Sequence, residues 1–371
     1  MGGIFQSGKL KHIDLPFKMP ASLLLCRFLM SEFDLIRRFF VRPTPGADLG
    51  PGDDCALMQV TPGQQLAVST DMLVAGTHFF PDADPRQLGW KTLAVNVSDL
   101  AAMGAKPRWA TLAMSLPAAD EGWLAAFAEG FFACAQAYGI DLVGGDTTRG
   151  PLNLSVTVMG EVPIGQALRR EGAQDGDDVW VSGRPGLAGL GLRYLQEKVV
   201  LPSLWQKLCL ASLHKPHPRV ELGLALRGKA SAAIDVSDGL LADLGHLVEA
   251  SGLVADVVLN QLPSLPEGVD RASALDCQLA GGDDYELCFT APFEQRLILA
   301  QLAAELELPL WRIGQCREPN SPRYLNNPDD NHPSPPKMIP TENENPGLVQ
   351  VLGPDGEVIE IERHGYDHFR P

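Results

Sequence analysis

Two periods of apolar residues alternate along this chain. Residues 66–70 have the length and composition of a short buried strand, whereas residues 86–103 place Leu93, Val97 and Leu100 on one side of a helix. Regular alternation of such segments predicts an α/β or layered α+β fold. Further strands are expected at 109–116, 153–162, 178–182, 232–236, 254–259, 286–290 and 311–314, and helices at 31–40, 123–138, 240–251, 292–306 and within 186–228.

A break in this pattern divides the chain. The segment 163–176 carries neither period, so we expect one domain at 30–164 and a second at 165–371. Residues 1–29 are expected to be an N-terminal extension before Met30. They hold a short apolar run without a signal-peptide cleavage site, which disfavours secretion.

A Pro-rich segment interrupts the second domain. Residues 317–347 combine proline with Asn, Asp and Ser and have almost no apolar content, which predicts a loop or disordered insertion. The apolar segments on either side, 311–314 and 348–352, are expected to pair as strands around it.

Composition narrows the functional classes. The 371 residues are 45% apolar, enough for a substantial core, and 30 basic against 46 acidic residues give a net charge of −16. Such an acidic chain is not expected to bind nucleic acid, and anionic substrates would need metal ions to bridge the charge. Seven cysteines without a C-x-x-C spacing favour free thiols in the reducing cytoplasm. The chain lacks an apolar stretch of about 20 residues, so no membrane span is expected.

Short acidic clusters beside Gly, Ser or Thr are the main chemical signal. Carboxylates at strand ends beside small residues suit Mg²⁺, which takes oxygen ligands and brings phosphate oxygens with it. The clusters are Gly52-Asp53-Asp54, Ser69-Thr70-Asp71, Asn96-Val97-Ser98-Asp99, Gly144-Gly145-Asp146, Asp235-Val236-Ser237-Asp238, Gly281-Gly282-Asp283-Asp284 and Asp175-Gly176-Asp177-Asp178.

Each cluster also has a purely structural interpretation. Asp54 fits an ordinary turn, and Asp71, expected to end a strand, fits helix capping as well as ligand binding. A single histidine such as His78 is usually structural. Arg149, after the glycine turn at 144–145, could bind phosphate or pair with Asp146. Ser237 or Asp238 could be a plain N-cap, or could serve phosphate and metal at a helix N-terminus.

Taken together, the clusters favour one shared site. Asp99 lies inside an apolar helix, where a buried carboxylate needs a cation or hydrogen-bond donors. Asp175 to Asp178 fits a plain turn and is left out. The remaining groups occur in both halves, which predicts a site between two domains that gathers Mg²⁺ ions around a nucleotide. The chain lacks the P-loop and protein-kinase motifs, so metals and loop backbones would hold the phosphates.

Several motifs resemble the thiamine-monophosphate kinases, within the aminoimidazole ribonucleotide synthetase superfamily. They are GDDCALM, STDMLVAGTHF, KTLAVNVSDLAAMGAKP, VGGDTTRGPL, AIDVSDGLLADLGH, GGDDYELCF and the ending GYDHF. The resemblance implies a two-domain fold, a homodimer formed by N-terminal strands, and a cleft where ATP and thiamine monophosphate meet.

By motif position, the resemblance also implies roles for individual residues. Asp54, Asp71 and Asp99 would be the principal catalytic groups, and Arg169 is an alternative to Arg170 for the ATP contact. The implied Mg²⁺ ligands are Asp54, Ser69, Thr70, Asp71, Asp99, Asp146, Asp235 and Asp238; the ATP contacts are Gly145, Asp146, Arg170 and Ser237; the substrate contacts are His78, Asp283 and Tyr366.

This sequence departs from the family pattern at two places. Position 283 is Asp where the family often has Glu, so a direct substrate contact could become water-mediated. The insertion at 317–347 precedes the ending that supplies Tyr366 and could affect how that ending closes.

The implied reaction is direct in-line transfer of the ATP γ-phosphate to thiamine monophosphate, giving thiamine diphosphate. An anionic phosphate oxygen is already a nucleophile, so positioning and charge neutralisation would carry catalysis. The alternatives are a superfamily synthetase that activates a carbonyl or amide oxygen, and a nucleotide sensor without catalysis.

Overall fold

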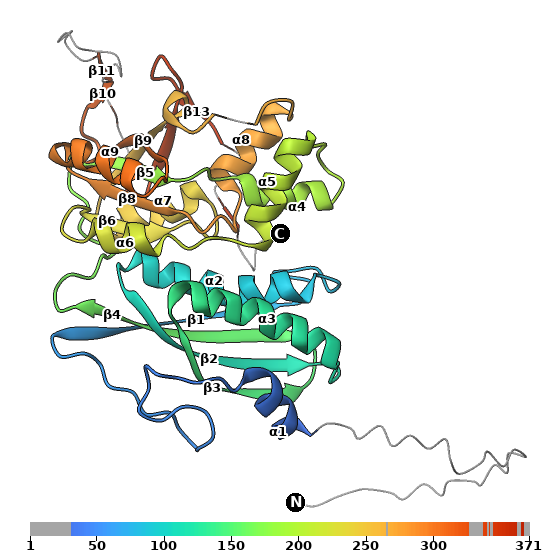
Figure 1. Ribbon diagram of the computed structural model, residues 1–371. Helices are drawn as coiled ribbons and strands as arrows, with labels where there is room; N and C mark the ends of the chain where they lie inside the picture. The colour runs from blue at the N-terminus through green and yellow to red at the C-terminus, as the bar shows by residue number, and fades with distance from the viewer. Residues whose placement is uncertain are drawn as a thin grey trace, which may run out of the picture.

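The computed structural model has two large β-sheets with helices between and around them, and a small two-stranded sheet formed by β10 (Arg323–Leu325) and β11 (Lys337–Ile339) (Figure 1). This mixture confirms the predicted α/β class. The structure describes residues 31–264, 266–325, 337–339, 341, 344–361 and 365–366. The expected extension at 1–29 and the middle of the Pro-rich insertion lie outside the described residues.

The N-terminal sheet has the strand order β1-β4-β2-β3 and is antiparallel except for the β2–β3 pair. Helices α2 and α3 lie between this sheet and the C-terminal part (Figure 1). The side of the sheet that faces away from these helices is called the outer face below. The elements are α1 (Glu32–Leu35), the π-helical turn η1 (Ile36–Phe40), β1 (Gln64–Val74), α2 (Pro85–Ala102), β2 (Lys106–Leu116), α3 (Glu121–Tyr138), β3 (Asp141–Arg149) and β4 (Asn153–Pro163).

Helix α2 is held in place from its first turn. Asp84 accepts a hydrogen bond from the Gln87 N–H at 2.9 Å, and Pro85 occupies the first helical position, where its missing N–H costs nothing. Gly89 allows α2 to approach α3 closely, because a Cβ at this position would lie 2.0 Å from the Phe127 carbonyl oxygen. Side chains of α2 are therefore presented to the C-terminal part from a fixed position.

The C-terminal sheet has the order β13-β12-β7-β9-β5-β8-β6, with one parallel pair, β12–β7. Its core is aliphatic, with Val179, Val181 and Leu244 fully buried. The elements are β5 (Asp178–Ser182), α4 (Leu187–Leu195), α5 (Ser203–His214), α6 (Val220–Leu226), β6 (Ala232–Asp235), α7 (Leu240–Ala250), β7 (Val254–Val258), η2 (Leu259–Gln261), α8 (Arg271–Ala280), β8 (Leu287–Ala291), η3 (Phe293–Gln295), α9 (Arg296–Glu305), β9 (Leu310–Arg317), β10 (Arg323–Leu325), β11 (Lys337–Ile339), β12 (Val349–Leu352) and β13 (Val358–Ile359).

Two expectations about strand ends are wrong. Strand β1 continues past Asp71 to Val74, because every residue from Gln64 to Val74 pairs with a residue of β4. Gly145 and Asp146 lie inside β3 rather than in a turn. The clusters around Asp71 and Asp146 are therefore parts of strands, and their side chains follow the alternation of a strand.

The flanks of the insertion are also arranged differently from the prediction. Strands β9 and β12 do not pair with each other, because β7 lies between them in the sheet. The insertion is not entirely loop, since β10 pairs with β11 in antiparallel fashion. At its base, the buried Arg317 side chain binds both Asp256 and Glu344, and these pairs join the two ends of the insertion to the sheet.

No helix in the described part of the chain is both long and apolar enough to cross a bilayer.

Candidate active site

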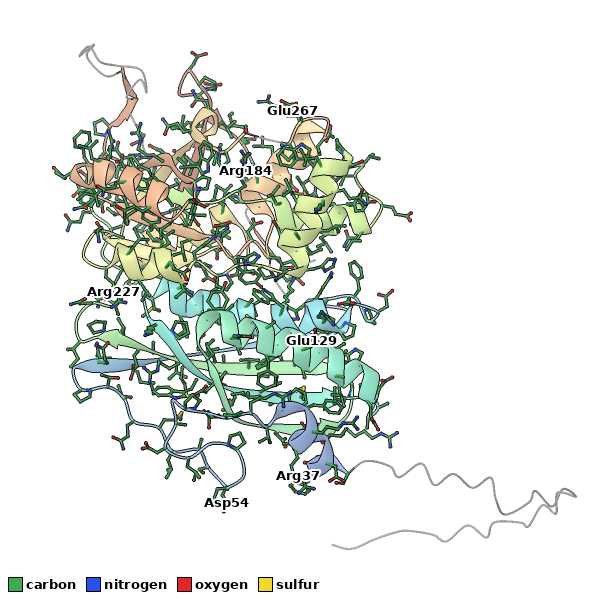
Figure 2. The ribbon with its side chains drawn as sticks, viewed as in Figure 1. Arg37, Asp54, Glu129, Arg184, Arg227 and Glu267 are labelled. Atoms are coloured by element: carbon green, nitrogen blue, oxygen red, sulfur yellow. The ribbon has the colours of Figure 1, made fainter. Side chains whose placement is uncertain are left out.

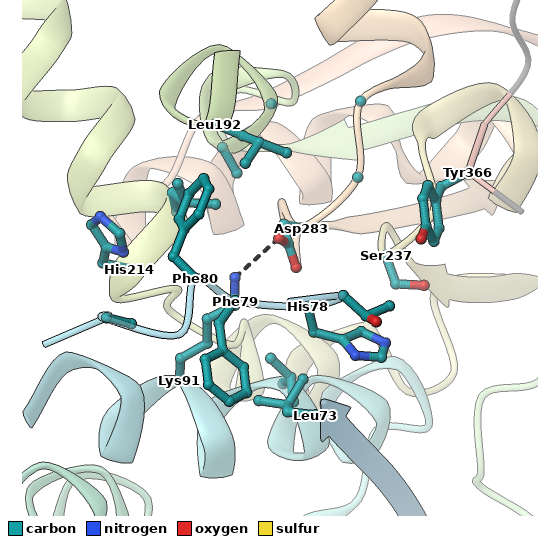
Figure 3. Close-up of a pocket in the computed structure, with 18 of the residues that line it drawn as sticks. Leu73, His78, Phe79, Phe80, Lys91, Leu192, His214, Ser237, Asp283 and Tyr366 are labelled. Atoms are coloured by element: carbon teal, nitrogen blue, oxygen red, sulfur yellow. Dashed lines mark hydrogen bonds and ion pairs between the residues drawn. The ribbon is translucent and has the colours of Figure 1, made fainter. Parts of the chain in front are cut away.

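A cavity of about 1300 Å³ lies where α2 and the C-terminal end of β1 meet the C-terminal part (Figure 3). Its walls come from β1 and the following segment, α2, α4, the β6–α7 turn and the segment before β8. Predicted site residues that line it are Thr70, Asp71, His78, Asp99, Asp235, Ser237, Asp238, Asp283 and Tyr366.

Acidic side chains from three segments, β1, α2 and the β6–α7 turn, converge on one side of the cavity. Burial, with the charges of Asp99 and Asp238, raises the pKa of Asp71 from 3.8 to about 6. Burial, followed by the Asp99 charge, raises the pKa of Asp235 to about 8. Among the described residues, no lysine, arginine or histidine forms an ion pair with Asp71, Asp99 or Asp235. These carboxylates lie together, largely shielded from solvent, and no described cation is ion-paired with them.

Strand and helix periodicity explain how these groups meet. Ser69 and Asp71 lie two residues apart on β1 and face α2, where Asn96 and Asp99 lie three residues apart and share a helix face. The Ser69 hydroxyl donates to Asp99 Oδ2 at 2.5 Å, and Asn96 Oδ1 accepts from the Asp71 N–H at 2.8 Å. Burial raises the pKa of Asp99, although the Ser69 hydrogen bond and the Arg170 charge oppose this effect.

The arrangement fits a hard divalent cation in its chemistry. All candidate donors are oxygens, as Mg²⁺ prefers, and a dication would relieve the repulsion that raises these pKa values. However, no three of the described His, Cys, Asp and Glu residues already have the close spacing of a metal site. The acids approach one another without forming a compact ligand set.

Sequence reasoning missed Asp243, which organises the β6–α7 turn. Its Oδ2 accepts from the N–H groups of Ser237, Asp238 and Gly239 at 2.9, 3.0 and 3.1 Å. These are the N–H groups that the sequence suggested for a phosphate, so the helix N-terminus is already occupied by a side chain. The position of Asp243 in the first turn after Ser-Asp-Gly could have revealed it, because acids often cap helix N-termini.

The opposite side of the cavity combines aromatic residues with a few polar groups (Figure 3). His78 Nδ1 accepts the Val74 N–H at 3.0 Å, so this ring nitrogen carries no proton. The Asp283 carboxylate accepts hydrogen bonds from Lys91 Nζ at 3.0 Å and from the Tyr285 hydroxyl at 3.1 Å. Asp283 and Tyr285 both have positive φ, 69° and 52°, which is rare for residues with a side chain and turns this segment into the cavity.

The chain ending reaches the same cavity. The Tyr366 N–H donates to the Asp238 carbonyl oxygen at 2.9 Å, which places Tyr366 beside the β6–α7 turn. Figure 3 shows the Tyr366 ring near Ser237, on the far side of the cavity from His214.

Five predicted residues do not line this cavity: Ser69, which reaches it only through its hydrogen bond to Asp99, Arg170, and the three that follow. Asp54 lies on an exposed loop on the far side of the N-terminal sheet (Figure 2). Gly145 and Asp146 lie on β3. Across the sheet, Asp146 pairs with Ala113, Ala113 with Ser155, and Ser155 with Met72, which is exposed on the outer face; Asp146 therefore lies on the outer face as well.

Two further predicted residues are placed differently from Asp71. Thr70 borders the cavity, but its side chain points to the outer face, where its hydroxyl lies 2.8 Å from that of Thr157. Arg170 does not line the cavity, but its charge acts on Asp99, whereas Arg169 pairs with Glu171 at the surface. The geometry thus favours Arg170 over Arg169 as the arginine near the acids.

Comparison with known proteins identifies the class to which this fold and site belong. Residues 52–162 match the family model described as AIR synthase related protein, N-terminal domain. The thiamine-monophosphate kinase of Salmonella typhimurium is 48% identical over 291 residues, covering 76% of this chain and 90% of the relative. The Escherichia coli K12 kinase is 43% identical, covering 91% and 98%.

Solved structures agree with the sequence matches. Thiamine-monophosphate kinase from Stenotrophomonas maltophilia superposes with a TM-score of 0.71 at 51% identity, covering 79% of this chain and 95% of that one. AaThiL complexed with AMPPCP and TMP gives 0.66 at 27% identity, covering 91% and 96%. The protein therefore has an AIR synthase-like fold. Within that class, the chain belongs to the thiamine-monophosphate kinase family.

Proposed function

We propose that this protein transfers the γ-phosphate of ATP to thiamine monophosphate, yielding thiamine diphosphate and ADP. The observation that carries the proposal is the cavity, in which Asp71, Asp99 and Asp235, with no ion pair to a described lysine, arginine or histidine, adjoin an aromatic pocket. The acidic side suits a polyanion with its metal ions, and the aromatic side suits a heteroaromatic ring. The family relation supports this assignment, because the AaThiL complex holds AMPPCP and TMP.

In this proposal the protein positions two anions rather than supplying a covalent intermediate. Asp71, Asp99, Asp235 and Asp238 are the residues of the cavity that would hold Mg²⁺, and bound Mg²⁺ would neutralise phosphate charge. The acceptor phosphate oxygen attacks in line without a general base. The hydrogen bond from Ser69 holds the Asp99 carboxylate in position to bind metal, and the hydrogen bonds to Asp243 hold the β6–α7 turn in place. His78, Asp283 and Tyr366 are assigned to the substrate, and Ser237 and Arg170 to ATP.

The outer face is proposed to form a homodimer. Leu66, Val68 and Met72 of β1 are 45, 56 and 53% exposed, which is unusual for large apolar side chains on one strand. A second copy would cover them, because sheets bury apolar faces by packing on one another.

The same dimer would account for Asp146. In one chain, Asp146 lies three strands away from β1, about 14 Å at ordinary strand spacing, and on the opposite face from Asp71. It therefore cannot join the acids of its own cavity, and we assign Asp146, with Gly145, to the site of the partner. Asp54, on the loop along this face, is assigned to the same interface region.

Mixing two inactive variants tests this assignment. Asp99→Asn and Asp146→Asn should each be inactive, yet mixed dimers contain one site with both acids intact, so activity should return to about a quarter of wild type. Mixtures that stay inactive would place Asp146 in the site of its own chain.

Acceptor selectivity tests the reaction itself. Coupled ADP release should depend on thiamine monophosphate and on Mg²⁺, and should not occur with aminoimidazole precursors. Release of ADP with the precursors alone would favour a superfamily synthetase, whereas ATP binding without turnover would indicate a sensor.

We place the protein in the cytoplasm, because the described cysteines are free thiols and all except Cys55 are buried.

A further inference from the structure

Lys91 is a buried cation that the assignments above leave unused. It lies on α2, its side chain is 6% exposed, and its ammonium group contacts Asp283 Oδ2 at 3.0 Å (Figure 3). An ammonium group has three N–H donors, but the described residues supply one acceptor. Two donors remain for a ligand in the cavity.

Lys91 lies at the border between the acidic side and the aromatic side of the cavity. Burial, followed by the Lys91 charge, lowers the pKa of His214, which lies on the aromatic side with Phe80. The partner of Lys91, Asp283, binds Tyr285, whose pKa is raised by burial and by the charges of Asp283, Asp71 and Asp235. A ligand with its ring on the aromatic side would therefore carry its phosphate past Lys91 toward the acids.

Other cationic side chains of the cavity are less suited to this task. Arg193 is already paired with Asp276, and Lys198 is exposed after the end of α4. A buried cation discriminates more strongly than an exposed one, because water screens it less. Among the described residues lining the cavity, Lys91 is the buried lysine.

We propose that Lys91 binds the phosphate of the acceptor substrate and thereby selects thiamine monophosphate over unphosphorylated thiamine. The inference rests on the proposed function. Asp283 keeps the ammonium group in place and neutralised while the cavity is empty, and phosphate oxygens become its additional acceptors on binding.

The test compares the dissociation constants of thiamine and thiamine monophosphate, measured by calorimetry without ATP. In Lys91→Met the preference for the phosphorylated form should fall about tenfold or more, the usual effect of a lost charge-assisted hydrogen bond. Lys198→Met, at the exposed lysine, is the matched control and should keep the preference.

A double variant separates binding from simple neutralisation. Lys91→Met leaves Asp283 unpaired, so Lys91→Met/Asp283→Asn removes that charge as well and should still lack the preference. Recovery in the double variant, or loss in Lys198→Met instead, would overturn the proposal. If wild type binds neither compound, the proposed function fails rather than the role of Lys91, and thermal melting of each variant shows whether it is folded.

Discussion

Replacing Asp71 with Asn should stabilise the metal-free protein and weaken its response to Mg²⁺. The Asp71 carboxylate is largely buried, and among the described residues no cation pairs with it. Its folded pKa of about 6 lies above the ordinary 3.8, so its contribution to stability is full below pH 3.8 and is lost as pH rises through 6.

The size of the effect follows from this difference. A carboxylate with a pKa of about 6 instead of 3.8 opposes folding at pH 8 by at most about 3 kcal/mol. Partial exposure of Asp71 reduces this to about 1–2 kcal/mol. For a chain of this size, the melting temperature of Asp71→Asn with a chelator present should rise by about 1–3 °C at pH 8.

Differential scanning calorimetry at pH 8 and pH 5, with chelator or Mg²⁺, provides the assay. Wild type should gain stability from Mg²⁺ at pH 8 and much less at pH 5, because protons compete for the same oxygens. Asp178→Asn is the control, since Asp178 is buried with Arg296 and Arg312 and its loss should destabilise the protein whether or not Mg²⁺ is present. A lower melting temperature for metal-free Asp71→Asn, or an unchanged Mg²⁺ response, would refute the reasoning.

Three further predictions address separate parts of the structure. Asp99→Asn should lower turnover more than about hundredfold with an unchanged circular dichroism spectrum, and near-normal activity would exclude a role in holding metal. Arg219→Met leaves the buried Glu286 carboxylate without its two hydrogen bonds from Arg219 and should cost about 3 kcal/mol in urea unfolding; an unaltered midpoint would show that the pair contributes little. Val68→Asp should yield monomers in sedimentation velocity experiments, whereas dimers of wild-type size would exclude the outer face as the interface.

Sequence reasoning recovered the elements whose periodicity is strong. Helix α2 was expected at 86–103 and spans Pro85–Ala102, and the strand expected at 232–236 spans Ala232–Asp235. Helix α8 was missed, because its apolar pattern is weak, although its N-cap Asp270 accepts the Ser273 N–H as a helix start should.

The site was harder to predict than the fold, because the outcome depends on which face of a strand each residue occupies. Asp71 reaches the cavity since it faces α2, while its neighbour Thr70 faces outward by the same alternation. Asp146 was grouped with Asp71 from its acidic cluster beside glycines and from the family motif, but the strand order places the two residues at opposite edges of one sheet. Strand order and register involve contacts between distant segments, so local sequence patterns do not reveal them.

The cluster Asp175 to Asp178, which was left out of the site, also shows that local patterns do not reveal distant contacts. Asp177 does hold a turn, accepting the Gln174 N–H at 2.9 Å, as predicted for residues 175–178. Asp178 begins β5, in agreement with the strand expected at 178–182, but it also binds Arg296, which is 118 residues away. A partner so distant in sequence cannot be inferred from a short acidic motif.

The central claim is direct in-line transfer between two substrates held together in one cavity. The most direct measurement uses ATP whose γ-phosphate is made chiral with oxygen isotopes and determines the configuration of the phosphorus in the thiamine diphosphate formed. A single in-line displacement predicts inversion at phosphorus. Retention would mean that the phosphoryl group passes through a covalent enzyme intermediate, which would contradict the account.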